Sequence, residues 1–104
     1  MSEVFSVEQQ DGLTTLSFSV RELNRTNSER FLEDCAEVPF DQTKKIALDL
    51  SEVSFIDSKG MSALLEFQIQ ISNEDITISL LNLTAKIRQI FISLGIDHYF
   101  EINE

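Results

Sequence analysis

This 104-residue chain has one cysteine and no long apolar run, and these two features limit the covalent cross-links and the membrane segments that it can form. The single cysteine, Cys35, cannot form an internal disulfide, and its apolar neighbours at helical spacing predict a buried thiol. No apolar run approaches the roughly 20 residues that a membrane-spanning helix needs, and no basic-then-apolar leader opens the chain. We therefore expect a protein of the reducing cytoplasm that does not insert into a membrane.

Basic residues are also few. Eight Lys and Arg stand against eighteen Asp and Glu, which gives a formal net charge of −10. Binding of nucleic acid requires clustered cations that neutralise phosphates, whereas these eight are scattered along the sequence. The same excess of acid disfavours anionic membrane surfaces. The charge therefore argues against nucleic acid as a partner and is compatible with a basic protein partner.

The residues that most catalytic sites require are missing. No G-x-x-x-x-G-K-S/T phosphate cradle is present, and no acidic pair has His or Cys at ligand spacing, so neither a cofactor nor a metal is expected. A nucleophilic serine needs a general base, but the only histidine, His98, follows the last predicted helix. A phosphoaspartate at Asp57 would need further carboxylates for Mg²⁺, and Asp11 has no acidic neighbour. We predict a binding protein, not an enzyme.

What the chain does contain fits one globular domain over residues 1–104, with 42% apolar residues and eight Phe. Alternation with period two predicts two strands, around residues 5–7 and 16–20, joined by a hairpin turn at Asp11-Gly12. The same alternation predicts strands at residues 46–50 and 76–80. Residues 99–102 have the pattern of a short edge strand.

Three helices are predicted between and after these strands. Thr26-Asn27-Ser28-Glu29 has the form of a capping box before the first helix, and Asn73 and Gly95 are expected to stop the second and third. The apolar residues that define the three helical faces are Phe31, Leu32 and Cys35; Met61, Leu64, Leu65 and Ile69; and Ile87, Ile90, Phe91 and Leu94. The order predicts an α/β fold in which a mixed sheet of four or five strands opens with an antiparallel hairpin and carries helices mainly on one face.

The most informative segment is residues 55–61, where an apolar strand passes without proline into a helical pattern. This places the Ser58 hydroxyl in the first turn of a helix, beside Asp57 and unpaired backbone N–H groups, which favours an oxyanion. We predict that Ser58 is phosphorylated. Gly60 removes a side chain that would block approach to the helix start, and Lys59 adds a nearby positive charge. An alternative stays open, in which Ser58 or Asp57 only caps the helix.

Residues 46–51, 53–60 and 62–65 closely resemble the STAS-domain anti-sigma factor antagonists, and the likeness extends over nearly the whole chain. The resemblance implies a single STAS-like domain in which Ser58 is the serine that an anti-sigma factor with serine kinase activity phosphorylates. It further implies partner switching. The unphosphorylated protein binds the kinase so that a sigma factor is released, and a phosphoserine phosphatase resets the cycle.

The expected partner surface is centred on Ser58 and supported by its neighbours Asp57, Lys59, Gly60, Met61 and Ser62. The chain departs from the family pattern at Lys59, where a small residue is usual, and at Arg21, where Gly is frequent. Related STAS domains also serve transporters. The alternative function is therefore an accessory subunit of a lipid- or anion-transport complex, which acts as a binding module without a phosphoswitch.

Overall fold

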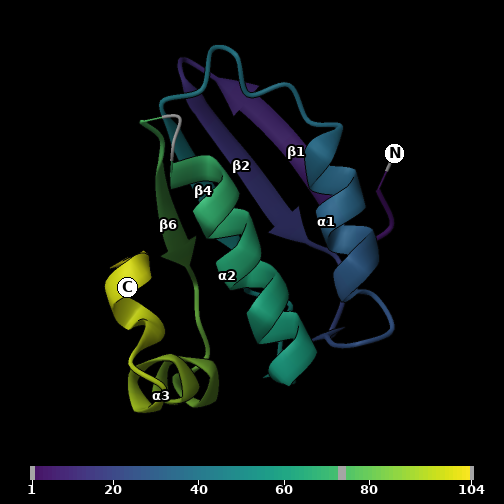
Figure 1. The fold of residues 1–104 in the computed structure, drawn as a ribbon, viewed down its shortest axis with the longest axis vertical. Coiled ribbons are helices and arrows are strands. Elements are labelled where there is room, and N and C mark those ends of the chain that lie inside the picture. The colour runs from purple at the N-terminus through teal and green to yellow at the C-terminus, as the bar shows by residue number, and fades with distance from the viewer. Residues whose placement is uncertain (1, 73–74, 104) are drawn as a thin grey trace.

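The fold is seen in a computed structural model that describes residues 2–72 and 75–103 (Figure 1). The strands are β1 (Phe5–Gln10), β2 (Leu13–Phe18), β3 (Glu22–Leu23), β4 (Lys45–Asp49), β5 (Phe55–Ile56), β6 (Thr77–Leu81) and β7 (Glu101–Asn103). The helices are α1 (Ser28–Ala36), α2 (Ser58–Ser72) and α3 (Ala85–Ser93), followed by the 3-10 turn η1 (Ile96–Tyr99). The predicted helical stop at Asn73 lies outside the described residues.

The main sheet has five strands in the order β1-β2-β4-β6-β7. The β1–β2 pair is antiparallel, and the other three pairs are parallel, since helices connect successive strands of the sheet. Asp11 and Gly12 form the hairpin turn with φ values of 51° and 84°, the left-handed conformation that matches strand twist. The predicted mixed sheet opened by an antiparallel hairpin is therefore confirmed.

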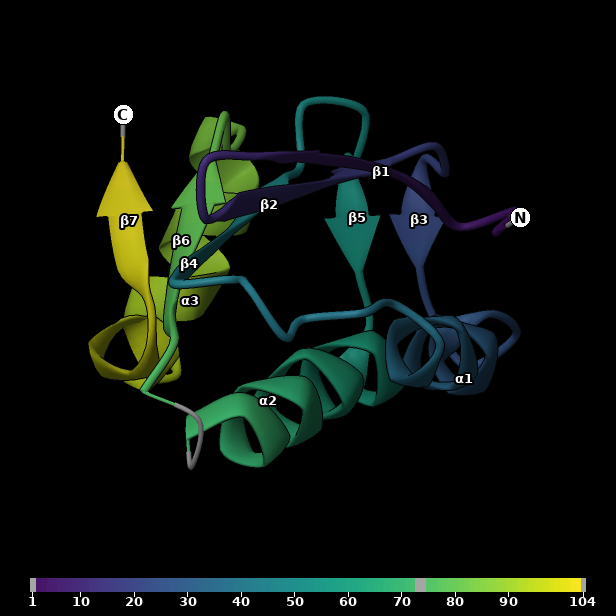
Figure 2. The same cartoon turned by 90° about the horizontal axis from the view of Figure 1, so that it is seen from above.

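The two faces of this sheet differ in polarity because side chains alternate along each strand. Leu16, Leu48 and Leu80 are aligned across β2, β4 and β6, and all three are fully buried. The neighbouring row on the opposite face contains Ala47 and Ser79. Helices α1 and α2 lie on the same side of the sheet, as Figure 2 shows. The prediction that helices lie mainly on one face is confirmed.

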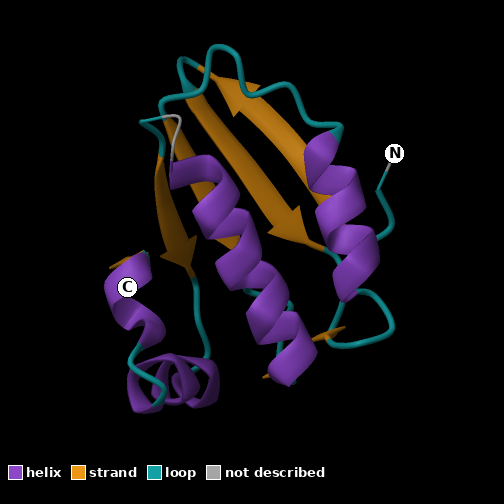
Figure 3. Ribbon diagram, in the orientation of Figure 1, coloured by secondary structure: helices purple, strands orange, loops and turns teal. Residues whose placement is uncertain are grey.

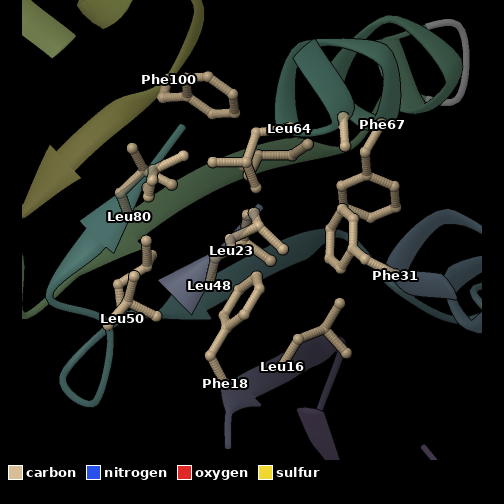
Figure 4. Close-up of a cluster of buried hydrophobic side chains, with 14 of the residues drawn as sticks. Leu16, Phe18, Leu23, Phe31, Leu48, Leu50, Leu64, Phe67, Leu80 and Phe100 are labelled. Carbon is tan, nitrogen blue, oxygen red and sulfur yellow. The ribbon is translucent and has the colours of Figure 1, made fainter. Parts of the chain in front are cut away.

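Phe31 of α1 connects the helical layer to the sheet (Figure 4). Its ring centroid lies 5.9 Å from that of Phe5, 5.4 Å from that of Phe18 and 5.7 Å from that of Phe67. Aromatic pairs at such distances add to the free energy gained from burial. Cys35, one turn further along α1, is buried as predicted, and burial raises the pKa of its thiol.

Two predicted helical faces were partly wrong. Ile69 of α2 is 62% exposed, and Leu94, which follows α3, is 61% exposed. The inner side of α2 is instead formed by Leu64, Phe67 and Ile71, and Phe67 was not predicted. These helices carry apolar residues on more than one side, so the spacing alone did not decide which side packs on the sheet.

Some of the predicted helix and strand boundaries are confirmed and others are wrong. The capping box at Thr26 is not formed, because α1 begins at Ser28 and the side chain of its N-cap, Asn27, bonds back to the backbone of β3 and the following loop. Gly95 ends α3 in the left-handed conformation, with φ of 69°, as predicted. The predicted edge strand is β7, but Tyr99 lies before it, in η1.

Candidate functional site

A pair of two-residue strands holds the chain immediately before Ser58. Strands β3 and β5 run parallel, and this pairing was not predicted because two residues show no periodicity. Leu23 and Ile56 of the pair are buried, while the N–H of Asp57 donates to the carbonyl of Leu23 at 3.1 Å. The start of α2 is therefore anchored by its backbone to a segment more than thirty positions earlier.

Gly60 allows α2 to approach β3 closely. A Cβ atom at this position would lie 2.2 Å from the carbonyl oxygen of Leu23, a distance that no side chain tolerates without a backbone shift. Gly60 is accordingly buried. The sequence predicted that the missing side chain of Gly60 leaves room for an incoming group at the helix start. The structure shows that this room is taken by the backbone of Leu23.

Asp57 is the residue that caps α2. Its Oδ1 accepts a hydrogen bond from the N–H of Gly60 at 2.8 Å, three residues along, which is the usual N-cap geometry. Its Oδ2 accepts another from the N–H of Arg25 at 3.1 Å. The Gly60 hydrogen bond, followed by those from the Arg25 and Lys59 backbones, holds the pKa of Asp57 below its ordinary value.

Ser58 is left free by this arrangement. Its side chain is exposed at the first residue of α2, and across residues 2–72 and 75–103 its hydroxyl makes no hydrogen bond. Figure 3 places the start of α2 at the end of the domain opposite the β1–β2 hairpin turn. Asp57 therefore supplies the helix cap and Ser58 does not, while phosphorylation of Ser58 stays a prediction.

The other predicted surface residues divide by burial. Lys59 and Ser62 are exposed, and Ser62 follows Ser58 by one helical turn on the same face of α2. Met61 is only 6% exposed and belongs to the core. Met61 and Gly60 therefore set the position of the helix start, while Lys59 and Ser62 present side chains to the outside.

Phe55 is an exposed aromatic side chain that the sequence prediction treated only as part of a strand. It is 40% exposed in β5, two positions before Asp57. The Nζ of Lys86, from α3, lies 5.7 Å from the centroid of its ring, within cation–π range. An exposed ring with a cation above it is a candidate contact for a protein partner.

The described residues were also compared with the requirements of a metal site, a serine nucleophile and a membrane-spanning helix. Among the described residues, no group of three or more His, Cys, Asp or Glu side chains is placed to hold a metal ion. His98, on η1, is exposed and lies in a segment remote in sequence from Ser58. Within the part of the chain that the structure describes, no helix has the length and apolar character required to cross a membrane.

The fold and the serine at the helix start together define a small α/β domain with an exposed serine at one end of its sheet. The family model for the STAS domain matches residues 5–104, and the chain belongs to this family. The family prediction made from the sequence is confirmed. No curated protein sequence matches the chain at a significant level.

Solved structures share this fold at low sequence identity. An anti-sigma-factor antagonist (STAS) domain protein from Planctomyces limnophilus has a TM-score of 0.82 and 18% identity, over 96% of this chain and 88% of that one. The phosphorylated form of the Bacillus cell fate determinant SpoIIAA has a TM-score of 0.70 and 19% identity, over 96% and 91% of the two chains. The murine anion transporter Solute Carrier 26 family member A9 has a TM-score of 0.78 and 20% identity, over 91% of this chain but 16% of the transporter.

Proposed function

We propose that this chain is an anti-sigma factor antagonist in a bacterial partner-switching pathway. In its unphosphorylated form it binds an anti-sigma factor that is also a serine kinase, so that a sigma factor is released. Phosphorylation of Ser58 dissociates the complex, and a phosphoserine phosphatase restores the binding form. The observation that carries the proposal is the exposed Ser58 hydroxyl, which no hydrogen bond from the described residues engages.

The site favours a phosphorylation switch that leaves the fold intact. Phosphate adds about −1.5 to −2 charges at the start of a helix, where the dipole and free N–H groups stabilise an anion by about 0.3–1 kcal/mol. Because Asp57 already caps α2, the modified hydroxyl takes no hydrogen bond away from the helix. Against a tightly apposed partner, the same phosphate loses water, and an unpaired buried charge costs about 3–5 kcal/mol. The penalty at the interface exceeds the local gain, so phosphorylation weakens binding.

The binding surface comprises the outward side of the α2 start and its surroundings. Lys59 and Ser62 contribute exposed side chains beside Ser58, and Phe55 contributes an apolar contact. Asp57, Gly60 and Met61 support the phosphosite from behind. The protein acts by binding alone, and the ATP-dependent chemistry belongs to the kinase in the cytoplasm.

The proposal is tested by calorimetric titration of the anti-sigma kinase with unmodified protein and with protein phosphorylated at Ser58. We expect affinity to fall at least about a hundredfold, which corresponds to about 2.7 kcal/mol. Phosphoserine placed at Ser62, exposed one turn later, is the matched control and is expected to weaken binding less. Equal affinities of the unmodified and Ser58-phosphorylated proteins would refute the switch.

A second candidate is a STAS subunit of a lipid- or anion-transport complex, which the similarity to an anion transporter's domain supports. Affinity capture from the native cell with Ser58→Ala and Ser58→Asp baits separates the two functions. A kinase recovered with Ser58→Ala and lost with Ser58→Asp supports the antagonist. Transport permease and ATPase subunits recovered with both baits, without a kinase, support the transport subunit.

A further inference from the structure

Two cations beside the Ser58 turn are not engaged in ion pairs with the described residues. Arg25 and Lys59 are exposed, and neither forms an ion pair within the described ranges. Arg30, the next cation along the chain after Arg25, does form an ion pair, with the carboxylate of Asp34 at 3.2 Å. Acidic residues outnumber basic ones by eighteen to eight, so partners for cations are abundant in this chain.

Arg25 is connected to one chain neighbour of Ser58 by a hydrogen bond and shares a groove with the other. Its backbone N–H donates to Oδ2 of Asp57 at 3.1 Å. Its side chain lines, together with Lys59, a shallow groove of about 320 Å³ between α1 and the first turns of α2. Ser58 lies between Asp57 and Lys59 in the chain, and Ser62, one turn later on the same face of α2, also lines this groove, so the two cations lie on the segments next to the Ser58 turn.

The backbone that carries Arg25 is held by several hydrogen bonds. The N–H of Thr26 donates to Oδ1 of Asn24 at 3.0 Å, and the N–H of Asn24 donates to Oδ1 of Asn27 at 2.9 Å. The Nδ2 of Asn27 donates to the carbonyl of Glu22 at 2.9 Å. The loop is therefore ordered before any ligand arrives, so only the Arg25 side chain has to be immobilised.

The charge of Arg25 already acts on this turn, because it contributes to the lowered pKa of Asp57, after the backbone hydrogen bonds. The other charged groups that face the groove are Lys59 and Glu66 on α2 and Glu29 on α1. Glu66 is two helical turns beyond Ser58, and Asp57 is occupied by its hydrogen bonds to Gly60 and Arg25. The cations are the groups available to a new anion at the turn.

We infer that Arg25 and Lys59 form an intramolecular clamp for a phosphate on Ser58. The planar guanidinium donates paired hydrogen bonds to phosphate oxygens, the ammonium of Lys59 adds a point charge, and the positive end of the α2 dipole favours the anion. This inference rests on the proposed phosphorylation and deepens it. The clamp takes both cations away from the partner at the moment the phosphate arrives, so one modification neutralises the positive charge that these two side chains present.

The clamp is tested on protein with phosphoserine encoded genetically at position 58, in the otherwise unchanged chain and in Arg25→Gln, Lys59→Gln and Arg30→Gln variants. Phosphorus NMR titration measures the second pKa of the phosphoserine in each. We expect Arg25→Gln and Lys59→Gln each to raise that pKa by about half a unit or more, because an adjacent cation favours the dianion. Arg30→Gln, the matched control on α1, is expected to leave it unchanged, and added salt is expected to reduce the differences.

A second signal comes from the Arg25 side chain itself. Its Nε–H resonance is expected to shift on phosphorylation while that of Arg30 does not, and a merely structural Arg25 would show no such response. Identical phosphoserine pKa values in the unchanged chain and in Arg25→Gln, with an unshifted Nε–H resonance, would overturn the clamp. Since the phosphoserine is encoded, this result does not depend on whether a kinase modifies Ser58, which the titration with the kinase decides separately.

Discussion

The two ends of the sheet differ in whether their polar side chains are hydrogen-bonded within the protein. At the hairpin end, the hydroxyl of Thr14, only 1% exposed, accepts from Gln9 Nε2 at 3.1 Å and lies 2.6 Å from the hydroxyl of Thr43. Gln9 also donates to the carbonyl of Pro39 at 2.7 Å. At the serine end, the hydroxyl of Ser58 has no such partner among the described residues.

The polar side chains at the hairpin end stabilise the fold, whereas those at the serine end are available to bind a partner or ligand. A hollow of about 380 Å³ at the hairpin end is the larger of the two concavities compared, yet polar side chains that line it bond to one another. Buried polar groups must be satisfied for stability, so such a network stabilises the fold and offers little to a ligand. The serine end satisfies its backbone through Asp57 and leaves its hydroxyl and cations for function.

The largest expected effect on stability comes from a substitution at the serine end. Gly60→Ala forces a Cβ against the carbonyl of Leu23, and we expect the free energy of unfolding to fall by about 3 kcal/mol, at the upper end for overpacking. Chemical denaturation measures this change. Ser62→Ala, exposed on the same helix, is the control, and a Gly60→Ala protein as stable as that control would contradict the close approach of α2 and β3.

A smaller effect on stability is expected when the hydrogen bonds at the hairpin end are removed. Thr14→Val keeps the shape of the side chain but removes the hydroxyl that joins Gln9 and Thr43. Since Thr43 is only half-buried and regains water, we expect a loss of about 1 kcal/mol in unfolding free energy, with affinity for the proposed kinase unchanged. A loss of kinase affinity in this variant would show that the two ends are not independent.

The pH dependence at the serine end is set by Asp57. Its pKa is lowered in the folded protein from an ordinary value of 3.8, so the ionised carboxylate stabilises the fold at neutral pH. This contribution is complete above about pH 4 and is lost as pH falls through the folded pKa. Asp57→Asn is expected to lower the melting temperature relative to wild type more at pH 7 than at pH 3. Asp41→Asn, exposed at the other end, controls for loss of one carboxylate, and an equal deficit at both pH values would argue against the cap.

The smallest expected effect is that of Ser58→Ala on stability. Because the hydroxyl makes no hydrogen bond with the described residues, the unfolding free energy is expected to stay within about 0.5 kcal/mol of wild type. Denaturation of this variant beside Thr14→Val sharpens the comparison between a free and a bonded hydroxyl. A destabilisation of Ser58→Ala as large as that of Thr14→Val would return Ser58 to a structural role.

The sequence by itself determined the features that local physics controls. Alternation along 46–50 and 76–80, the Asp11-Gly12 turn and the left-handed stop at Gly95 each depend on residues close together in the chain, and each was predicted. The placement of Ser58 at the start of a helix has the same origin, since a strand pattern changes there to a helical one.

Only the tertiary structure decided features that join distant segments. The β3–β5 pairing, the approach of Gly60 to Leu23 and the contact of Arg25 with Asp57 each link residues more than thirty positions apart. The burial of Phe67 and the exposure of Ile69 were likewise settled by packing on the sheet. Spacing reveals which faces a helix offers, but the neighbour that covers one of them is encoded elsewhere in the chain, and its contact exists only after folding.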